Sequence, residues 1–246
     1  MIKPQNFYAW GLAILFAFSF TACDDDDEGT LSDNENGNGN GAEVQTGTVT
    51  DKDGNVYQTR VIGDLEWMTE NLNTETSMGL SYCYDEATEN CETYGKLYDF
   101  EAITQGQEPS SGRIQGICPN GWFLPRRQDT YDVSVWNSNQ PNDLKADSEL
   151  WFGSGRGNNE TGFSALPGGS FRILIDDNDS SETLEFSDLS QGAFIWWLGD
   201  IEDAETFYGG NISIPAAGTQ VGHTSRTNED EFLLRVGYSC RCVKPL

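Results

Sequence analysis

The sequence feature that most restricts what this chain can become is a boundary near its start, where an apolar run is followed by a row of acidic residues. The run Phe7–Phe20 follows a lone Lys3 and ends in Thr21 and Ala22, after which come Cys23 and five acids. A charged start, an apolar stretch and small residues are typical of a signal peptide. About 14 apolar-rich residues are too few to span a bilayer, so the stretch predicts export.

The cysteine at this boundary predicts that the exported protein is a lipoprotein. The residues Phe20-Thr21-Ala22-Cys23 resemble a bacterial lipobox, although Phe20 replaces the usual leucine. The acids that follow resemble the signal that sends lipoproteins of Bacteroidetes-type bacteria to the outer face of the outer membrane. We therefore expect residues 1–22 to be removed and Cys23 to carry a lipid anchor, because acyl chains bind a membrane through every buried methylene. The alternative is an ordinary secreted protein.

Composition predicts a tether followed by one folded domain. Residues 23–46 are acidic and then rich in Gly and Asn, so they bury too little apolar surface to offset the entropy of ordering. Residues 47–246 are expected to form the domain. The formal net charge of −26 argues against nucleic acid as a partner, because phosphate binding needs clustered Lys and Arg.

The domain is expected to begin with a hairpin. Apolar and polar residues alternate on both sides of "DKDGN", which is typical of an Asp-Gly turn. The spacing of Asp51, Asp53 and Asn55 also resembles the start of an EF-hand loop, but no glutamate follows at the twelfth position, which favours the turn.

Later segments predict an α+β domain with two short helices, small antiparallel sheets and long loops. Helices are expected over Glu92–Ile103 and after Pro125. Strands are expected over Phe171–Ile175, Ala193–Leu198, Asn211–Ile214 and Leu233–Val243.

Five cysteines follow Cys23, and in an exported protein they predict disulfides. Cys83 and Cys91 can close a small loop. Cys118 can pair with either Cys240 or Cys242, because residues two apart share one face of a strand. A zinc site is disfavoured, since the chain has one histidine and no pair of C-x₂-C motifs.

Several blocks in order resemble a known family. They are "DKDGNVYQTRVIGDLEWMTENLN", "CYDEATENCETYGKLYDFEA", "GICPNGWFLPRRQD", "TGFSALPGGSF" and "RCVKPL". These resemble the Fibrobacter succinogenes major paralogous domain, a family similar to the C-type lectin-like superfamily, over Gly47–Leu246. The resemblance implies a C-type lectin-like fold tied by disulfides, and a bond between Cys118 and Cys242. Two blocks depart from the family pattern, "RRQDTYD" and "FIWWLGD".

The residues predict no enzyme. No G-x-S-x-G, H-E-x-x-H or phosphate-loop motif is present, and the one histidine, His223, lies in a polar stretch that is expected to be a solvated loop. Formylglycine-generating enzymes belong to the same wider superfamily and use paired cysteines with a metal, which draws attention to Cys240 and Cys242. One structural disulfide plus a spare thiol explains these two cysteines better.

Binding is the favoured role, through aromatic or acidic groups on long loops. Side chains alternate along a strand, so Trp196 and Trp197 are not both expected in the core; the resemblance assigns Trp197 to the core and leaves Trp196 to stack on a ligand or pack under a loop. Calcium is the one cofactor with candidate ligands, although a solvated acidic turn is favoured. Those ligands are Asp176, Asp177, Asn178, Asp179 and Glu182.

Together these features predict a lipoprotein of the outer membrane that faces the cell exterior. Its expected role is non-catalytic adhesion or binding of a ligand, either a carbohydrate or a surface protein. The alternative is an accessory subunit of a surface assembly such as a fimbrial tip, which would need an unpaired strand edge or a large apolar patch.

Overall fold

The structure is a computed structural model that describes residues 45–108, 112–135, 140–176, 178–199, 209–218, 220–226 and 235–246. The expected leader, Cys23 and nearly all of the expected tether lie outside the described residues, as does Asp177. The first described strand begins at Thr46, next to the expected start of the domain.

The predicted first hairpin is confirmed. Strands β1 (Thr46–Thr50) and β2 (Val56–Ile62) pair antiparallel around the expected turn. Asp51 anchors this turn, because its carboxylate accepts hydrogen bonds from the backbone N–H of Asn55 at 2.9 Å and from the Tyr57 hydroxyl at 2.7 Å.

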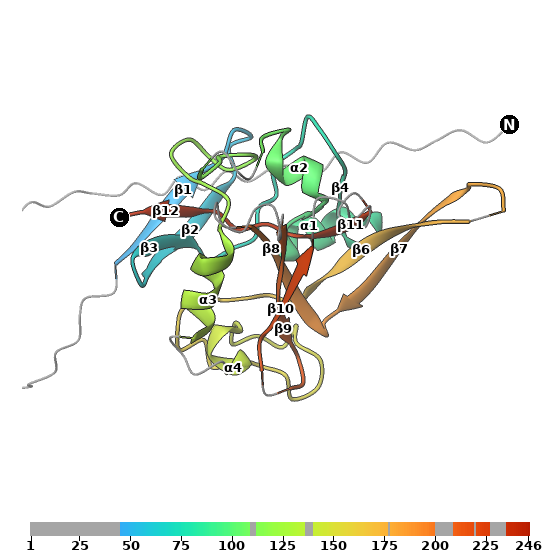
Figure 1. The fold of residues 1–246 in the computed structure, drawn as a ribbon. Coiled ribbons are helices and arrows are strands. Elements are labelled where there is room, and N and C mark those ends of the chain that lie inside the picture. The colour runs from blue at the N-terminus through green and yellow to red at the C-terminus, as the bar shows by residue number, and fades with distance from the viewer. Residues whose placement is uncertain are drawn as a thin grey trace, which may run out of the picture. The chain divides into compact units, whose positions relative to one another are not determined.

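The smaller sheet has four strands in the order β1-β2-β3-β12. Strand β3 (Leu65–Met68) continues from the hairpin, whereas β12 (Val243–Pro245) is the end of the chain (Figure 1). The C-terminus is therefore built into the sheet that starts the domain.

The larger sheet has eight strands, with β10-β9-β8-β6-β11-β5-β4 in order and β7 paired to β6. Strands β6 and β7 form a long hairpin that projects from the body (Figure 1). The strands are β4 (Ser81–Tyr82), β5 (Leu97–Tyr98), β6 (Gly168–Ile175), β7 (Glu182–Leu189), β8 (Gly192–Leu198), β9 (Gly209–Pro215), β10 (Gly222–Arg226) and β11 (Val236–Ser239).

The helices are short. They are the 3₁₀ turn η1 (Tyr84–Glu86), α1 (Thr88–Tyr94), α2 (Phe100–Thr104), α3 (Arg127–Val135) and α4 (Pro141–Leu144). The helix predicted after Pro125 is confirmed by α3. Of the helices among the described residues, none has the length and hydropathy needed to cross a membrane.

The single helix predicted over Glu92–Ile103 is wrong, because the chain breaks it in two. Gly95 ends α1 with φ at +75°, a conformation that favours glycine, and a Cβ there would lie 2.7 Å from the carbonyl oxygen of Leu72. Strand β5 follows, and Asp99 then caps α2 by accepting a hydrogen bond from the N–H of Ala102 at 2.7 Å.

The predicted fold class is also wrong. Among the described residues the structure is mostly β, with 38% strand and 15% helix, so it is not an α+β C-type lectin with two helices and small sheets. Three of the expected strands join the eight-stranded sheet as β6, β8 and β9, whereas the single strand expected over Leu233–Val243 is divided between β11 in that sheet and β12 in the smaller one. Strand β7 was missed because its sequence, "ETLEFSDL", lies half exposed and carries acids instead of a clean apolar alternation.

Strand β8 has a hydrophobic core on each face, which corrects the expectation for its two tryptophans. Trp196 belongs to a cluster with Tyr98 and Phe100, and Ile195 belongs to a second cluster with Trp67. Trp196 and Trp197 are 1% and 0% exposed. Alternation along the strand does not expose either tryptophan, because β8 is a central strand that is covered on both sides.

Both expected disulfides are present, Cys83–Cys91 and Cys118–Cys242, and Cys240 is a buried free thiol. The second bond lies where the C-terminal segment passes from β11 in the larger sheet to β12 in the smaller one. Along this passage the N–H of Leu72 donates to the Cys240 carbonyl at 2.9 Å, and the N–H of Met68 donates to the Cys242 carbonyl at 3.1 Å.

Arg241, between these two cysteines, is completely buried. Its guanidinium donates to Oδ1 of Asn71 at 2.7 Å, to the Ser164 carbonyl at 3.0 Å and to the Phe163 carbonyl, and it lies 4.6 Å from the centre of the Phe163 ring. Burial lowers its pKa to about 9, so it remains charged at neutral pH. The planar guanidinium thus donates hydrogen bonds to three acceptors, which lie in two segments that are far apart in the sequence.

We predict that Arg241→Lys will lower the free energy of unfolding by about 3 kcal/mol, because an ammonium cannot satisfy three buried acceptors in this geometry. Urea unfolding with the disulfides intact measures the change. Arg156→Lys is the matched control, since Arg156 is half exposed in a surface ion pair and should change stability by less than about 0.5 kcal/mol. Equal losses in the two variants would contradict the assignment.

Candidate functional site

A cavity of about 340 Å³ lies between the turn that joins β2 to β3 and one face of α3. Its volume is within the range of small-ligand sites. It is lined by Ile62, Gly63, Asp64, Leu65, Trp67, Arg113, Asp129, Asp132 and Val133.

The floor of the cavity is apolar and well packed. Trp67, on β3, packs edge-on against Phe163 with ring centres 5.5 Å apart, and Val133 on α3 belongs to the same cluster. The Trp67 indole nitrogen is buried and has no hydrogen-bond partner among the described residues. Because Trp67 is only 1% exposed, it closes the floor from below, and the half-buried Ile62 and Leu65 supply the accessible apolar surface.

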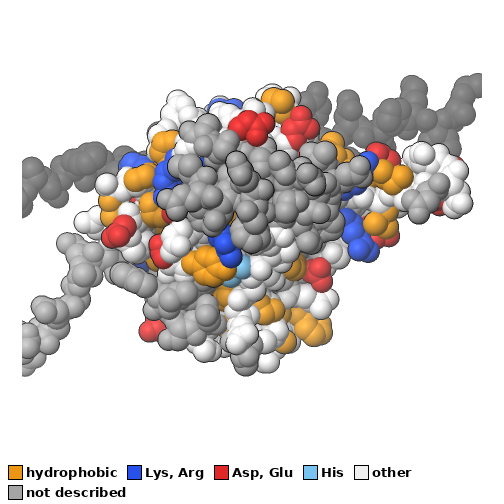
Figure 2. Space-filling view, in the orientation of Figure 1, with side chains coloured by type: hydrophobic (Ala, Val, Ile, Leu, Met, Phe, Trp, Pro, Cys, Tyr) orange, Lys and Arg blue, Asp and Glu red, His pale blue; other side chains and the backbone are white. Residues whose placement is uncertain are grey.

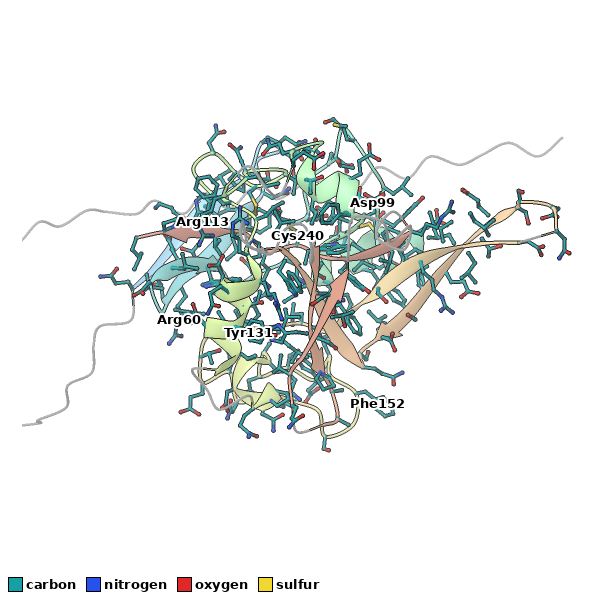
Figure 3. All side chains as sticks on the ribbon, viewed as in Figure 1. Arg60, Asp99, Arg113, Tyr131, Phe152 and Cys240 are labelled. Atoms are coloured by element: carbon teal, nitrogen blue, oxygen red, sulfur yellow. A yellow bond between two sulfur atoms is a disulfide. The ribbon has the colours of Figure 1, made fainter. Side chains whose placement is uncertain are left out.

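Asp129 organises one wall. Its carboxylate accepts the backbone N–H of Arg126 at 2.8 Å, and both carboxylate oxygens accept N–H groups of Arg113, each at 2.8 Å. The negative charge of this residue in the first turn of α3 also interacts favourably with the positive end of the helix dipole. The bidentate pair therefore fixes the start of α3 against the loop that carries Arg113, which Figure 3 labels beside the smaller sheet.

The rim of the cavity carries a net negative charge. Arg113 and Asp129 neutralise each other, whereas Asp64 and Asp132 are exposed and form no ion pair with any described residue. Carboxylates beside an aromatic floor can accept hydrogen bonds from hydroxyl or ammonium groups. They also repel anionic ligands.

Two further cavities are less suited to a ligand. One, of about 400 Å³, lies between the end of β1 and residues 115–120. The side-chain amides of two lining residues already form hydrogen bonds within the protein. Gln105 donates to the Ala102 carbonyl at 2.6 Å, and Gln115 donates to the Cys118 carbonyl at 3.0 Å. The other, beside Tyr94, is smaller, at about 230 Å³.

His223 is not in a loop, as the sequence predicted, but on strand β10. Its ring stacks on that of Tyr131, with centres 4.2 Å apart, and the single histidine is visible at the surface in Figure 2 beside a hydrophobic side chain. Burial, together with the nearby Arg127, lowers its pKa to about 4. The imidazole is therefore neutral and weakly basic at physiological pH, which makes it a poor general base.

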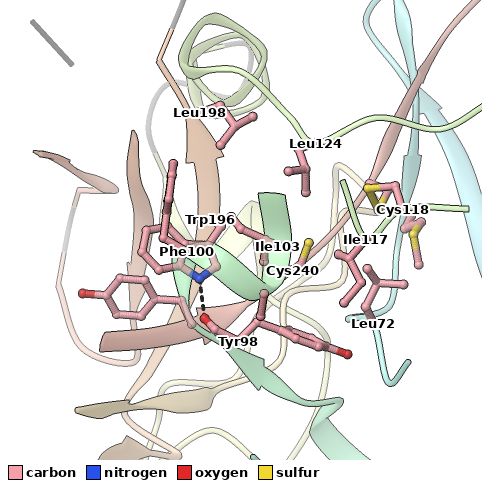
Figure 4. Packing of buried hydrophobic residues seen from close by; sticks show 14 of the residues in the cluster. Leu72, Tyr98, Phe100, Ile103, Ile117, Cys118, Leu124, Trp196, Leu198 and Cys240 are labelled. Carbon is pink, nitrogen blue, oxygen red and sulfur yellow. Dashed lines mark hydrogen bonds between the residues drawn. A yellow bond between two sulfur atoms is a disulfide. The ribbon is translucent and has the colours of Figure 1, made fainter. Parts of the chain in front are cut away.

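Trp196 is not a stacking surface. It lies in the core, and its indole N–H donates to the Tyr98 carbonyl at 2.7 Å (Figure 4). The aromatic side chain that is most exposed among the described residues is Phe152, at 70% (Figure 3). Its neighbour Trp151 is buried, and the sequence "LWFG" contains no signal that separates the two.

The acidic loop that holds the candidate calcium ligands, and for which a solvated turn is favoured, is the exposed turn between β6 and β7. Asp176 accepts hydrogen bonds from the backbone and side chain of Asn178, which hold its pKa below the usual range, and Asp179 accepts from the N–H of Ser181. Glu182 faces Arg235 at 3.5 Å. The described carboxylates thus engage in local contacts. Asp177 lies outside the described residues, so the calcium site stays a prediction.

A family model, the Fibrobacter succinogenes major domain, matches residues 61–244 of the 246. The chain belongs to this family. The matched part of the Fibrobacter succinogenes major domain runs from β2 to β12 and includes every residue that lines the cavity beside Trp67. It also contains both disulfides. Neither a curated protein nor a solved structure gives a significant match.

Proposed function

We propose that this protein is a non-catalytic binding module at the cell surface, and that it binds a carbohydrate in the cavity beside Trp67. The observation that carries the proposal is the combination of an apolar floor with a carboxylate rim in one cavity of ligand size. A sugar offers an apolar ring face for the floor, and its hydroxyls can donate hydrogen bonds to the carboxylates of the rim.

Electrostatics narrows the class of sugar. The chain carries a formal net charge of −26, and the rim adds Asp64 and Asp132 without a cationic partner among the described residues. Anionic sugars would approach against this field. The proposed ligands are therefore neutral sugars or amino sugars.

The test compares glycan-array binding of the purified protein and two charge-matched variants. We expect Asp132→Asn to weaken binding about tenfold, since a hydrogen bond to a charged group contributes roughly 1.5–3 kcal/mol. Glu89→Gln, an exposed change on α1 outside the cavity, should bind like the wild type. Equal binding by all three proteins would place the site elsewhere. No bound glycan, together with a mass in solution that rises with concentration, would support the subunit role instead.

Attachment to the membrane is a separate part of the proposal. We propose that Cys23 is acylated after removal of residues 1–22 and that the acids behind it direct the protein to the outer face of the outer membrane. Residues 23–46 would then lift the domain from the lipid surface.

Acylation is tested by feeding cells a labelled fatty acid. The expected result is a labelled protein in the membrane fraction and an unlabelled Cys23→Ala variant. Cys240→Ala is the matched control, because its thiol is buried in the domain, and it should retain the label. A wild-type protein without label would contradict the anchor.

A further inference from the structure

Three sulfur atoms meet in the core at the junction of the two sheets. The Sγ atoms of Cys118, Cys240 and Cys242 all lie within 4.8 Å of one another (Figure 4 labels the first two). Cys118 and Cys242 are bonded, whereas Cys240 is a free thiol that is 0% exposed. The free thiol is therefore close to both sulfurs of a disulfide.

Chain entropy does not select between the two ways of pairing Cys118. Its bond to Cys242 joins residues 124 apart, and a bond to Cys240 would close a loop only two residues shorter. In the chain-entropy model the stabilisation varies with the logarithm of loop length, so the two loops are equivalent. The observed pairing is then set by packing of the C-terminal segment.

We propose that Cys240 is an alternative partner of Cys118, and that the disulfide migrates between Cys242 and Cys240 when the C-terminal segment opens. The Cys240 thiolate attacks Sγ of Cys118, the bond between Cys118 and Cys242 breaks, and a bond between Cys118 and Cys240 forms. Cys242 leaves as a thiolate and takes up a proton. One disulfide and one thiol are present before and after, so no oxidant or reductant is consumed.

This disulfide exchange is suppressed in the native structure. The Cys240 thiol has no access to solvent, and burial raises its pKa, which disfavours the attacking thiolate. The hydrogen bonds that Leu72 and Met68 donate to the carbonyls of Cys240 and Cys242 also hold the segment in place. Exchange therefore requires local opening of these contacts, as occurs during folding or partial unfolding.

The direct test removes the native partner. In oxidised Cys242→Ser, we expect peptide mapping under non-reducing conditions to find a bond between Cys118 and Cys240. Its melting temperature should lie close to that of the wild type and above that of Cys118→Ser, which cannot form either bond. Free thiols at both Cys118 and Cys240 in the folded variant would overturn the proposal.

A second measurement follows the exchange in the wild type, with Cys240→Ser as the control. The wild type is held in urea below its unfolding midpoint at mildly alkaline pH, and free thiols are then trapped with iodoacetamide and mapped. Because the domain has one free thiol, label on Cys242 reports that the disulfide has moved. We expect label on both Cys240 and Cys242, with none on Cys242 in Cys240→Ser. Label confined to Cys240 at every time point would overturn the proposal.

Discussion

The disulfide between Cys118 and Cys242 fixes a described segment that takes part in both sheets. β11 pairs with β5, β6 and β8 in the larger sheet, and a few residues later β12 pairs with β3 in the smaller one. In the chain-entropy model, closing a loop of this length contributes roughly 4–5 kcal/mol. Arg241 adds a second constraint at the same place, because its buried guanidinium binds Asn71 on one side and the carbonyls of Phe163 and Ser164 on the other.

The candidate site depends on this junction. Trp67, the floor of the cavity, pairs with Val243 directly after the disulfide, and Phe163 contacts both Trp67 and the Arg241 guanidinium. The opposite wall is α3, whose first turn is held by the bidentate contact between Arg113 and Asp129. A well-packed apolar floor and a fixed helix are what a preformed binding site requires, since little ordering entropy is then lost on binding.

Local signals in the sequence predicted local structure. The Asp-Gly turn, the helix after Pro125 and the small disulfide loop at Cys83 each depend on neighbouring residues, and each is present. The pairing of Cys118 with Cys242 came from the family resemblance alone. The fold class failed because the joining of distant strands into an eight-stranded sheet leaves no local pattern. The same cause explains the burial of both Trp196 and Trp197, which were not both expected in the core, since the residues that cover β8 come from distant parts of the chain.

The cavity could not be predicted from the sequence, for a related reason. Its floor, its neutralised wall and its acidic rim come from three separate segments, and nothing in their sequences indicates that the three meet in space. The most direct test of the site follows the Trp67 indole N–H in proton–nitrogen NMR spectra, assigned with Trp67→Phe, during titration with neutral monosaccharides, hexosamines and hexuronic acids. The Trp67 signal should move with a neutral or amino sugar and stay in place with a hexuronic acid. A Trp67 signal that no sugar moves would contradict binding in this cavity.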